Sequence, residues 1–253
     1  MIAKLRADRG SGAGVVYVPG IDGTGELLLG TAARLEEDFR LLRFHYLAEG
    51  EASPATDSYA NLAASIAEGV RARGMERCVV VCESFGGAVG LQLALDHPQL
   101  VRGLIVVNSF AHYPSPNRLA WSMRLAPHLP RSLFNFGRRW LAPRSLFGHR
   151  READAVARFR ALPGAFFDAG YIRRLAMIAE LDLRPRLREV AQPVALYASS
   201  SDRIVPSTTS MAALHAALPD STLEVIEGAG HMVLPLSDEP WPERVREMVE
   251  RAL

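Results

Sequence analysis

This sequence has few cysteines, no long apolar run and almost no net charge. Only two of its 253 residues are cysteines, Cys78 and Cys82. They lie four positions apart in a segment with the pattern of a strand, where two side chains cannot easily reach each other. We therefore expect no disulfide, and two cysteines alone do not make a metal site.

The scarcity of apolar runs and of net charge excludes further classes of protein. No stretch reaches the 18 uncharged apolar residues of a transmembrane helix. Residues 1–9 mix apolar and charged side chains, unlike a secretory signal. Lysine and arginine total 29 against 28 acidic residues, without the basic excess of a dedicated nucleic-acid binder. These patterns predict a soluble cytoplasmic protein that does not bind nucleic acid.

What the sequence does contain is an alternation of short β-branched runs with longer helical patterns, which is typical of a parallel sheet covered by helices. The predicted strands are residues 15–18, 41–45, 78–82, 104–107, 194–198 and 222–226. The predicted helices are residues 26–37, 59–73, 85–97, 208–218 and 241–253.

Between residues 112 and 182 this alternation stops, and apolar and basic residues follow at helix-like spacing. The pattern predicts one α/β core domain, formed by residues 1–111 and 183–253, with a helical cap inserted at 112–182. We refer to residues 112–182 as the cap.

The strongest chemical signal is a serine between a strand and a helix, in residues 79–88, VVVCESFGGA. A tight turn of this kind can expose the Ser84 hydroxyl above the sheet as a nucleophile elbow. The usual pattern is G-x-S-x-G, and Cys82 replaces its first glycine, so the elbow must accept extra bulk. The alternative is an ordinary strand-to-helix turn in which Ser84 only caps the helix.

A serine needs a base and an orienting acid to become a nucleophile, and both follow later in the chain. Asp202 comes after the predicted strand 194–198, and His231 comes after the strand 222–226. The carboxyl ends of parallel strands share one edge of the sheet, so these loops can converge on Ser84. The order serine, aspartate, histidine predicts a catalytic triad of Ser84, Asp202 and His231.

A glycine-rich loop directly after the first predicted strand offers backbone donors. Residues 19–25 read PGIDGTG, and the backbone N–H groups of Ile21 and Phe85 are the candidate oxyanion donors. A phosphate-binding loop is the alternative, but the lysine and Ser/Thr pair of the Walker pattern and the dinucleotide spacing are both missing. Asp22 is a candidate substrate contact, with a turn role as its alternative.

These motifs together resemble the α/β-hydrolase superfamily over almost the full length of the chain. Residues 19–25 and the segment ESFGG at 83–87 are similar to the hydrolase portion of plant plastid proteins of the phytyl ester synthase type. The resemblance implies an esterase- or lipase-like reaction through a Ser-His-Asp triad and an acyl-enzyme, without metal or cofactor. It also implies, through short motifs only, a preference for lipid-like esters.

The cap is expected to select the substrate. Its many apolar residues can line an acyl pocket, and Trp121 and Phe134 are the candidate contacts, although packing alone also requires such residues. The cap carries twelve arginines against five acidic residues. This excess forms solvated helix faces or, alternatively, a surface for weak association with anionic membranes.

The sequence therefore predicts hydrolysis of a small-molecule carboxylic ester with a medium-sized hydrophobic part. Acyl transfer, thioester hydrolysis and C–C bond hydrolysis by the same triad stay open, as does a non-catalytic binder with this fold. A dehalogenase would require aspartate in place of Ser84.

Overall fold

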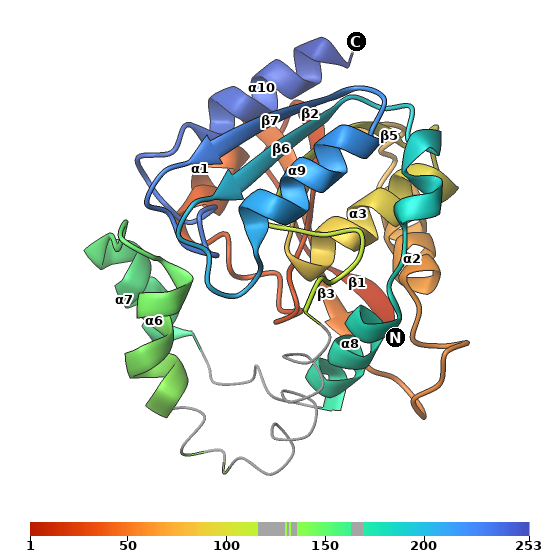
Figure 1. Cartoon of the computed structure of the whole chain (residues 1–253). Coiled ribbons are helices and arrows are strands. Elements are labelled where there is room, and N and C mark those ends of the chain that lie inside the picture. Colours follow the sequence, from red (N-terminus) through yellow and green to blue (C-terminus); the bar gives the residue numbers. More distant parts are fainter. Residues whose placement is uncertain (116–129, 131, 133–135, 163–168, 253) are drawn as a thin grey trace.

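The chain was analysed as a computed structural model, which describes residues 1–115, 130, 132, 136–162 and 169–252. Its centre is a seven-stranded sheet with the order β1-β3-β2-β4-β5-β6-β7 (Figure 1). The edge strand β1 is antiparallel to β3, and the other neighbours are parallel. The strands are β1 (Ile2–Arg9), β2 (Ala13–Val18), β3 (Phe39–Leu47), β4 (Cys78–Glu83), β5 (Val101–Val107), β6 (Val194–Ser199) and β7 (Ser221–Ile226).

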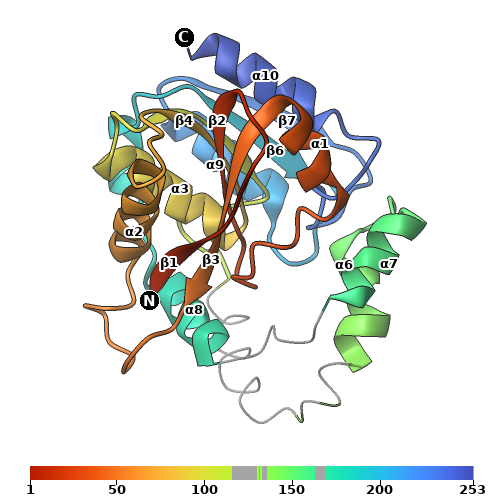
Figure 2. The ribbon, with the colours of Figure 1, turned by 180° about the vertical axis from the view of Figure 1, so that it is seen from behind.

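Helices cover both faces of this sheet. The helices that follow or precede its strands are α1 (Gly30–Asp38), α2 (Tyr59–Arg71), α3 (Phe85–Asp96), α9 (Ser207–Ala217) and α10 (Trp241–Arg251). Helices α2, α3 and α9 pack on one face and α1 and α10 on the other, which gives two apolar cores (Figures 1 and 2). In β4, Val80 and Cys82 face the first core while Val79 and Val81 face the second, as the period of two in a strand requires.

The part of the cap that the structure describes is helical. It contains a π-helix (Gly137–Leu141), α6 (Ala142–Leu146), α7 (Ala153–Ala161) and α8 (Ala169–Glu180), and a 3₁₀ helix (Arg184–Glu189) follows it. Figures 1 and 2 show α6 and α7 side by side and α8 apart from them, close to β1 and β3. The division into a core and a cap stays a prediction.

All six predicted strands are confirmed, but the sequence did not reveal β1. Its charged residues Lys4, Arg6 and Asp8 look like a solvated terminus. At the sheet edge β1 has neighbouring strands on one side only, so charged side chains can reach solvent there. The predicted helix at 26–37 begins later, at Gly30, because Leu29 before it has a positive φ of 48°.

The structure also describes the two cysteines and the length of the helices. Cys78 and Cys82 are both free and buried. Within the described ranges, no helix is long and apolar enough to cross a membrane. The cytoplasmic location stays a prediction.

Candidate active site

Ser84 lies on a strained turn between β4 and α3. Its backbone has φ 54° and ψ −124°, a region that non-glycine residues rarely adopt and that often marks functional sites. Gly86 has to be a glycine, because a Cβ there would lie 2.4 Å from the Pro19 carbonyl oxygen. A Cβ on Gly87 would lie 2.1 Å from the Ser109 hydroxyl. The elbow geometry therefore depends on close backbone approach to neighbouring segments.

The replacement of the first elbow glycine by Cys82 is accommodated inside the fold. The Cys82 side chain is fully buried, and a Cβ on Gly90 of α3 would lie 2.6 Å from its sulfur. Gly90 thus leaves the volume that the thiol fills. Burial raises the pKa of Cys82 strongly, with a smaller contribution from the charge of Glu83, so the thiol stays protonated and serves as a packing group.

Asp202 and His231 form a direct hydrogen bond. The distance from His231 Nδ1 to Asp202 Oδ2 is 2.7 Å, and the Asp202 side chain is inaccessible to solvent. Asp202 also accepts hydrogen bonds from the backbone N–H of Ile204 at 2.8 Å, from that of Val205 at 3.1 Å, and from the Ser207 hydroxyl. These donors fix the carboxylate, which in turn orients the imidazole ring and leaves Nε2 as its other nitrogen.

The pKa values of the pair shift in the directions that a base and its orienting acid need. Burial alone would lower the pKa of His231, but the charge of Asp202 and the hydrogen bond to it raise that pKa above its ordinary value. Burial would raise the pKa of Asp202, and His231 together with the donors around the carboxylate lowers it overall. Asp202 therefore stays ionised while His231 can take up a proton.

Asn108 and Ser109, directly after β5, connect the turn at Ser84 to the loop that holds His231. The sequence analysis did not single out either residue. Asn108 has a φ of 47° and is fully buried. Its Nδ2 donates to the Ser199 hydroxyl and to the His231 carbonyl, each at 2.8 Å. The Ser109 hydroxyl donates to the Ser84 carbonyl at 2.7 Å. Their place directly after a buried strand, like that of Asp202, is the signal that could have identified them.

Ser84 and His231 are brought to the same edge of the sheet without a direct hydrogen bond between them. The described residues include no hydrogen bond between the Ser84 hydroxyl and the imidazole, and Asn108 and Ser109 provide the connection between their loops. Catalytic hydrogen bonds are often long without substrate and tighten when it binds.

The predicted oxyanion loop lies against the elbow. A Cβ on Gly20 would be 3.5 Å from Ser84 Cβ, so the backbone of residues 20 and 21 passes next to Ser84. In the described part of the chain, the N–H groups of Ile21 and Phe85 have no intramolecular acceptor. For Phe85 this follows from its place at the first position of α3. Both groups are free to bind an oxyanion.

Two carboxyl groups are buried near Ser84. Glu83 accepts a hydrogen bond from the Tyr17 hydroxyl, and burial raises its pKa to about 7 against the lowering effect of that bond. Asp22 Oδ2 accepts from the Thr24 backbone N–H at 2.8 Å, whereas its Oδ1 is buried without a partner. Burial raises the pKa of Asp22. The hydrogen bond from Thr24 agrees with a turn role for Asp22. The unpartnered Oδ1 leaves open the alternative that Asp22 contacts the substrate.

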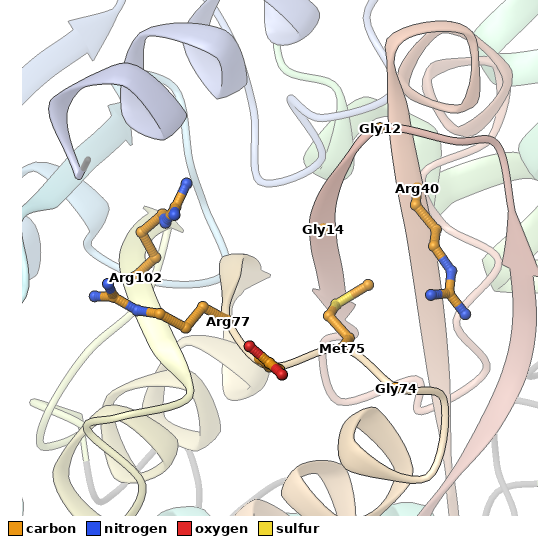
Figure 3. A pocket seen from close by; sticks show the side chains of 8 residues that line it. Gly12, Gly14, Arg40, Gly74, Met75, Arg77 and Arg102 are labelled. Carbon is orange, nitrogen blue, oxygen red and sulfur yellow. The ribbon is translucent and has the colours of Figure 1, made fainter.

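The remaining predicted contacts, Trp121 and Phe134, lie outside the described residues. No group of three or more His, Cys, Asp or Glu side chains in the described segments could hold a metal ion. A separate hollow, shown in Figure 3, lies at the amino ends of β2, β4 and β5, which is the opposite end of the sheet from Ser84. It is lined by Gly12, Gly14, Arg40, Gly74, Met75, Glu76, Arg77 and Arg102.

Comparisons with known proteins agree on the α/β-hydrolase fold. The family model described as alpha/beta hydrolase fold matches residues 15–238. A protein of Shigella flexneri serotype 5b (strain 8401) that carries the name "Putative carbamate hydrolase RutD" is 30% identical over 230 residues, covering 86% of this chain and 84% of that protein.

Solved structures share the fold at lower sequence identity. A thermophilic esterase from Thermogutta terrifontis superposes with a TM-score of 0.81 at 21% identity, over 99% of this chain and 93% of that one. An enol-lactonase from Burkholderia xenovorans LB400 has a TM-score of 0.81 at 18% identity, over 98% of this chain and 96% of that one.

Proposed function

Because this chain belongs to the α/β-hydrolase fold family, we propose that it is a serine hydrolase that cleaves carboxylic esters with a medium-sized hydrophobic part. The observation that carries the proposal is the 2.7 Å hydrogen bond between His231 Nδ1 and Asp202 Oδ2, at the same sheet edge as Ser84 on its strained turn. An oriented imidazole beside such a serine is the arrangement that activates a hydroxyl for acyl transfer.

The reaction starts when the Ser84 hydroxyl oxygen attacks the ester carbonyl. His231 Nε2 takes the hydroxyl proton, and the ionised Asp202 stabilises the imidazolium that forms. The N–H groups of Ile21 and Phe85 donate to the oxyanion of the tetrahedral intermediate. When the intermediate collapses, the proton on His231 goes to the leaving alcohol, and the acyl group stays on Ser84.

Water completes the cycle by the same steps in reverse order. His231 accepts a proton from the water molecule as its oxygen attacks the acyl carbonyl, and the same two N–H groups hold the second oxyanion. The carboxylic acid leaves and Ser84 regains its proton. Apart from the ester and water, no step requires a group that the chain itself does not supply.

Carbamate hydrolysis is a second candidate, favoured by the relative that carries the name carbamate hydrolase. The same nucleophile and base can attack a carbamate carbonyl, whose nitrogen lone pair makes it less electrophilic than that of an ester. The unpartnered Oδ1 of Asp22 supplies an acceptor that a carbamate N–H could use and that a simple ester would leave unpaired.

A panel of p-nitrophenyl esters of rising acyl length, run beside matched p-nitrophenyl N-alkyl carbamates, tests both candidates. We expect kcat/KM to be highest for medium-length esters and to fall to background in Ser84→Ala. Faster turnover of the carbamates would favour the second candidate. Hydrolysis of either class that survives in Ser84→Ala would refute the assigned nucleophile, and product analysis with an alcohol or acyl-CoA present would identify acyl transfer or thioesterase activity.

We also propose weak association of the cap with anionic lipid surfaces. Phe136, Trp140 and Leu141 are each at least half exposed, and the Arg139 and Arg160 guanidinium groups lie 5.9 and 5.0 Å from the centre of a Trp140 ring. Exposed apolar groups next to arginines suit a negatively charged interface. Flotation with liposomes should recover more protein when anionic lipid is present, and less with Trp140→Ala. Equal recovery on neutral and anionic liposomes would refute the association.

A further inference from the structure

Every carbonyl of the loop at residues 19–23 is held by a hydrogen bond. The Pro19 carbonyl accepts from the Tyr46 hydroxyl at 2.8 Å. The Gly20 carbonyl accepts from the Gly23 N–H at 3.1 Å, and the Gly23 carbonyl from the Tyr46 N–H at 2.8 Å. The two carbonyls between them, those of Ile21 and Asp22, both accept from one side chain, that of Arg174.

Arg174 comes from α8 in the cap, about 150 positions away in sequence from this loop. It is only 2% exposed, although arginine is among the residues least often buried. Its Nε lies 2.7 Å from the Ile21 oxygen and its Nη2 lies 3.2 Å from the Asp22 oxygen. A Cβ on Gly23 would lie 3.0 Å from the guanidinium carbon, so the group fits closely against the turn.

These contacts determine where the loop N–H groups can point. In a trans peptide the N–H and the preceding carbonyl point in opposite directions. The Gly20 carbonyl is bound by Gly23 inside the turn, so the N–H of Ile21 points out of it. That orientation lasts only while the following carbonyls of Ile21 and Asp22 keep their partner, because a buried carbonyl that loses its donor is left desolvated and unpaired, which drives rearrangement.

We propose that Arg174 is a positioning residue of the oxyanion hole: it holds the loop so that the Ile21 N–H faces the carbonyl that Ser84 attacks. The proposal rests on the serine-hydrolase function above. Arg174 acts through the loop backbone and does not touch the reacting atoms. A rigid planar guanidinium offers several donors in fixed directions and can bind two successive carbonyls, which a lysine ammonium does less well.

The neighbouring residue on α8 provides a matched control. Arg173 also ties this helix to the body of the protein, through a bidentate ion pair with Asp57 and a 3.0 Å bond from Nη1 to the Gly50 carbonyl. None of these contacts reaches residues 19–23. A substitution of Arg173 therefore removes a comparable anchor of α8 and leaves the oxyanion loop unchanged.

The experiment compares Arg174→Gln, Arg174→Lys and Arg173→Gln for kcat, KM, melting temperature and the Ki of a trifluoromethyl ketone analogue of the best ester. That inhibitor forms a tetrahedral oxyanion on the serine, so its Ki reports on the hole. We expect Arg174→Gln to lower kcat about 10- to 100-fold with KM within about threefold, since loss of a whole donor costs about 10²–10³. The Ki should rise by the same factor, and Arg174→Lys should recover part of both.

Arg173→Gln should lower the melting temperature and keep kcat and Ki within about twofold. Equal effects of the Arg173 and Arg174 variants on kcat would overturn the proposal, as would a drop in kcat without a rise in Ki. If Arg174→Gln does not fold, Arg174→Lys decides by the same two readouts. Failure of both to fold while Arg173→Gln folds would make Arg174 a folding residue and overturn its positioning role. A wild-type protein that turns over no substrate would instead refute the proposed function.

Discussion

The two ends of the parallel strands differ sharply although they belong to one sheet. At the carboxyl ends, Glu83, Ser84 and Asn108 are at most 7% exposed, and two of them have positive φ angles. At the amino ends, the polar residues around the hollow of Figure 3 include the exposed Glu76 and Arg77. Of the residues named here, those at the carboxyl ends are buried and two of them hold backbone strain, whereas Glu76 and Arg77 at the amino ends lie in solvent.

The positive φ angles and the buried polar groups at the carboxyl ends both cost folding free energy. A non-glycine residue held at positive φ costs about 1–3 kcal/mol, and a buried polar group costs a similar amount unless it is hydrogen-bonded. A fold that needed only stability would place such groups in solvent, as it does Glu76 and Arg77. Their concentration at the carboxyl ends, together with shifted pKa values, is the pattern of an active site.

Among the substitutions that leave Ser84 in place, Asp202→Asn is expected to lower kcat the most. The amide can no longer stabilise an imidazolium and favours the wrong tautomer of His231, so we expect kcat to fall about 10⁴-fold, as in other triads. Steady-state kinetics on the preferred substrate will measure this. The folded structure should survive, because an amide oxygen in the place of Oδ1 can still accept from the N–H groups of Ile204 and Val205, and the amide NH₂ in the place of Oδ2 can donate to the Ser207 hydroxyl oxygen. A loss smaller than tenfold would contradict the assignment of Asp202.

Asn108→Ala should combine a loss of stability with a loss of activity. It removes the donor to the His231 carbonyl and places alanine at φ 47°, which asparagine tolerates better. We expect a fall of about 2–4 kcal/mol in the free energy of unfolding and about a tenfold fall in kcat, one step of ~1.4 kcal/mol in the barrier. Urea unfolding and kinetics measure both.

Ser200→Ala is the control for Asn108. The Ser200 hydroxyl accepts from the Gly228 N–H at 2.9 Å in an exposed position, and so joins the loop after β6 to the same loop that holds His231. Its removal should cost less than about 1 kcal/mol and leave kcat unchanged. Similar effects of the two substitutions would mean that Asn108 has no special role between the elbow and the histidine.

Glu83→Gln should change the pH dependence of stability. The pKa of Glu83 is raised to about 7 in the folded protein, chiefly by burial. Between the ordinary glutamate pKa and this value, the unfolded chain releases a proton that the folded chain keeps, so stability falls as pH rises and stays low above the folded pKa. The variant lacks this loss and should be more stable than wild type at pH 8, by at most about 3 kcal/mol.

Urea unfolding of both proteins at pH 5 and pH 8 measures the effect, with a larger difference expected at pH 8. A difference that does not change with pH would place the pKa of Glu83 near its ordinary value. Removing this negative charge should also lower the pKa of His231, which Glu83 helps to raise. The acid limb of the kcat/KM profile should therefore move to lower pH in the variant.

Arg102→Ala, at the amino ends, is expected to have the smallest effect. Arg102 lines the hollow at the opposite end of the sheet from Ser84, and none of the other residues that line the hollow belongs to the candidate site. We expect kcat/KM within about twofold of wild type on the ester panel. A larger change would show that the two ends of the sheet are energetically coupled and would weaken the contrast between them.

The sequence predicted the parts of this site that follow local rules. Ser84 comes directly after β4, and Asp202 and His231 lie in the loops that follow β6 and β7. The β-branched runs that mark those strands are visible without a structure. Asn108 follows the same rule and could have been found. Arg174 could not, because in an arginine-rich helix it looks like one more solvated charge, and its partners lie about 150 positions away. Contacts over such distances depend on packing that no local pattern records.

The central claim is that the fold activates Ser84. Reaction with a fluorophosphonate probe, followed by mass spectrometry of the digested protein, tests it directly. We predict stoichiometric labelling on the peptide that contains Ser84 in the native protein, no labelling after denaturation, and none in Ser84→Ala. Absence of labelling in the native protein, or a label on another residue that persists in Ser84→Ala, would contradict the account.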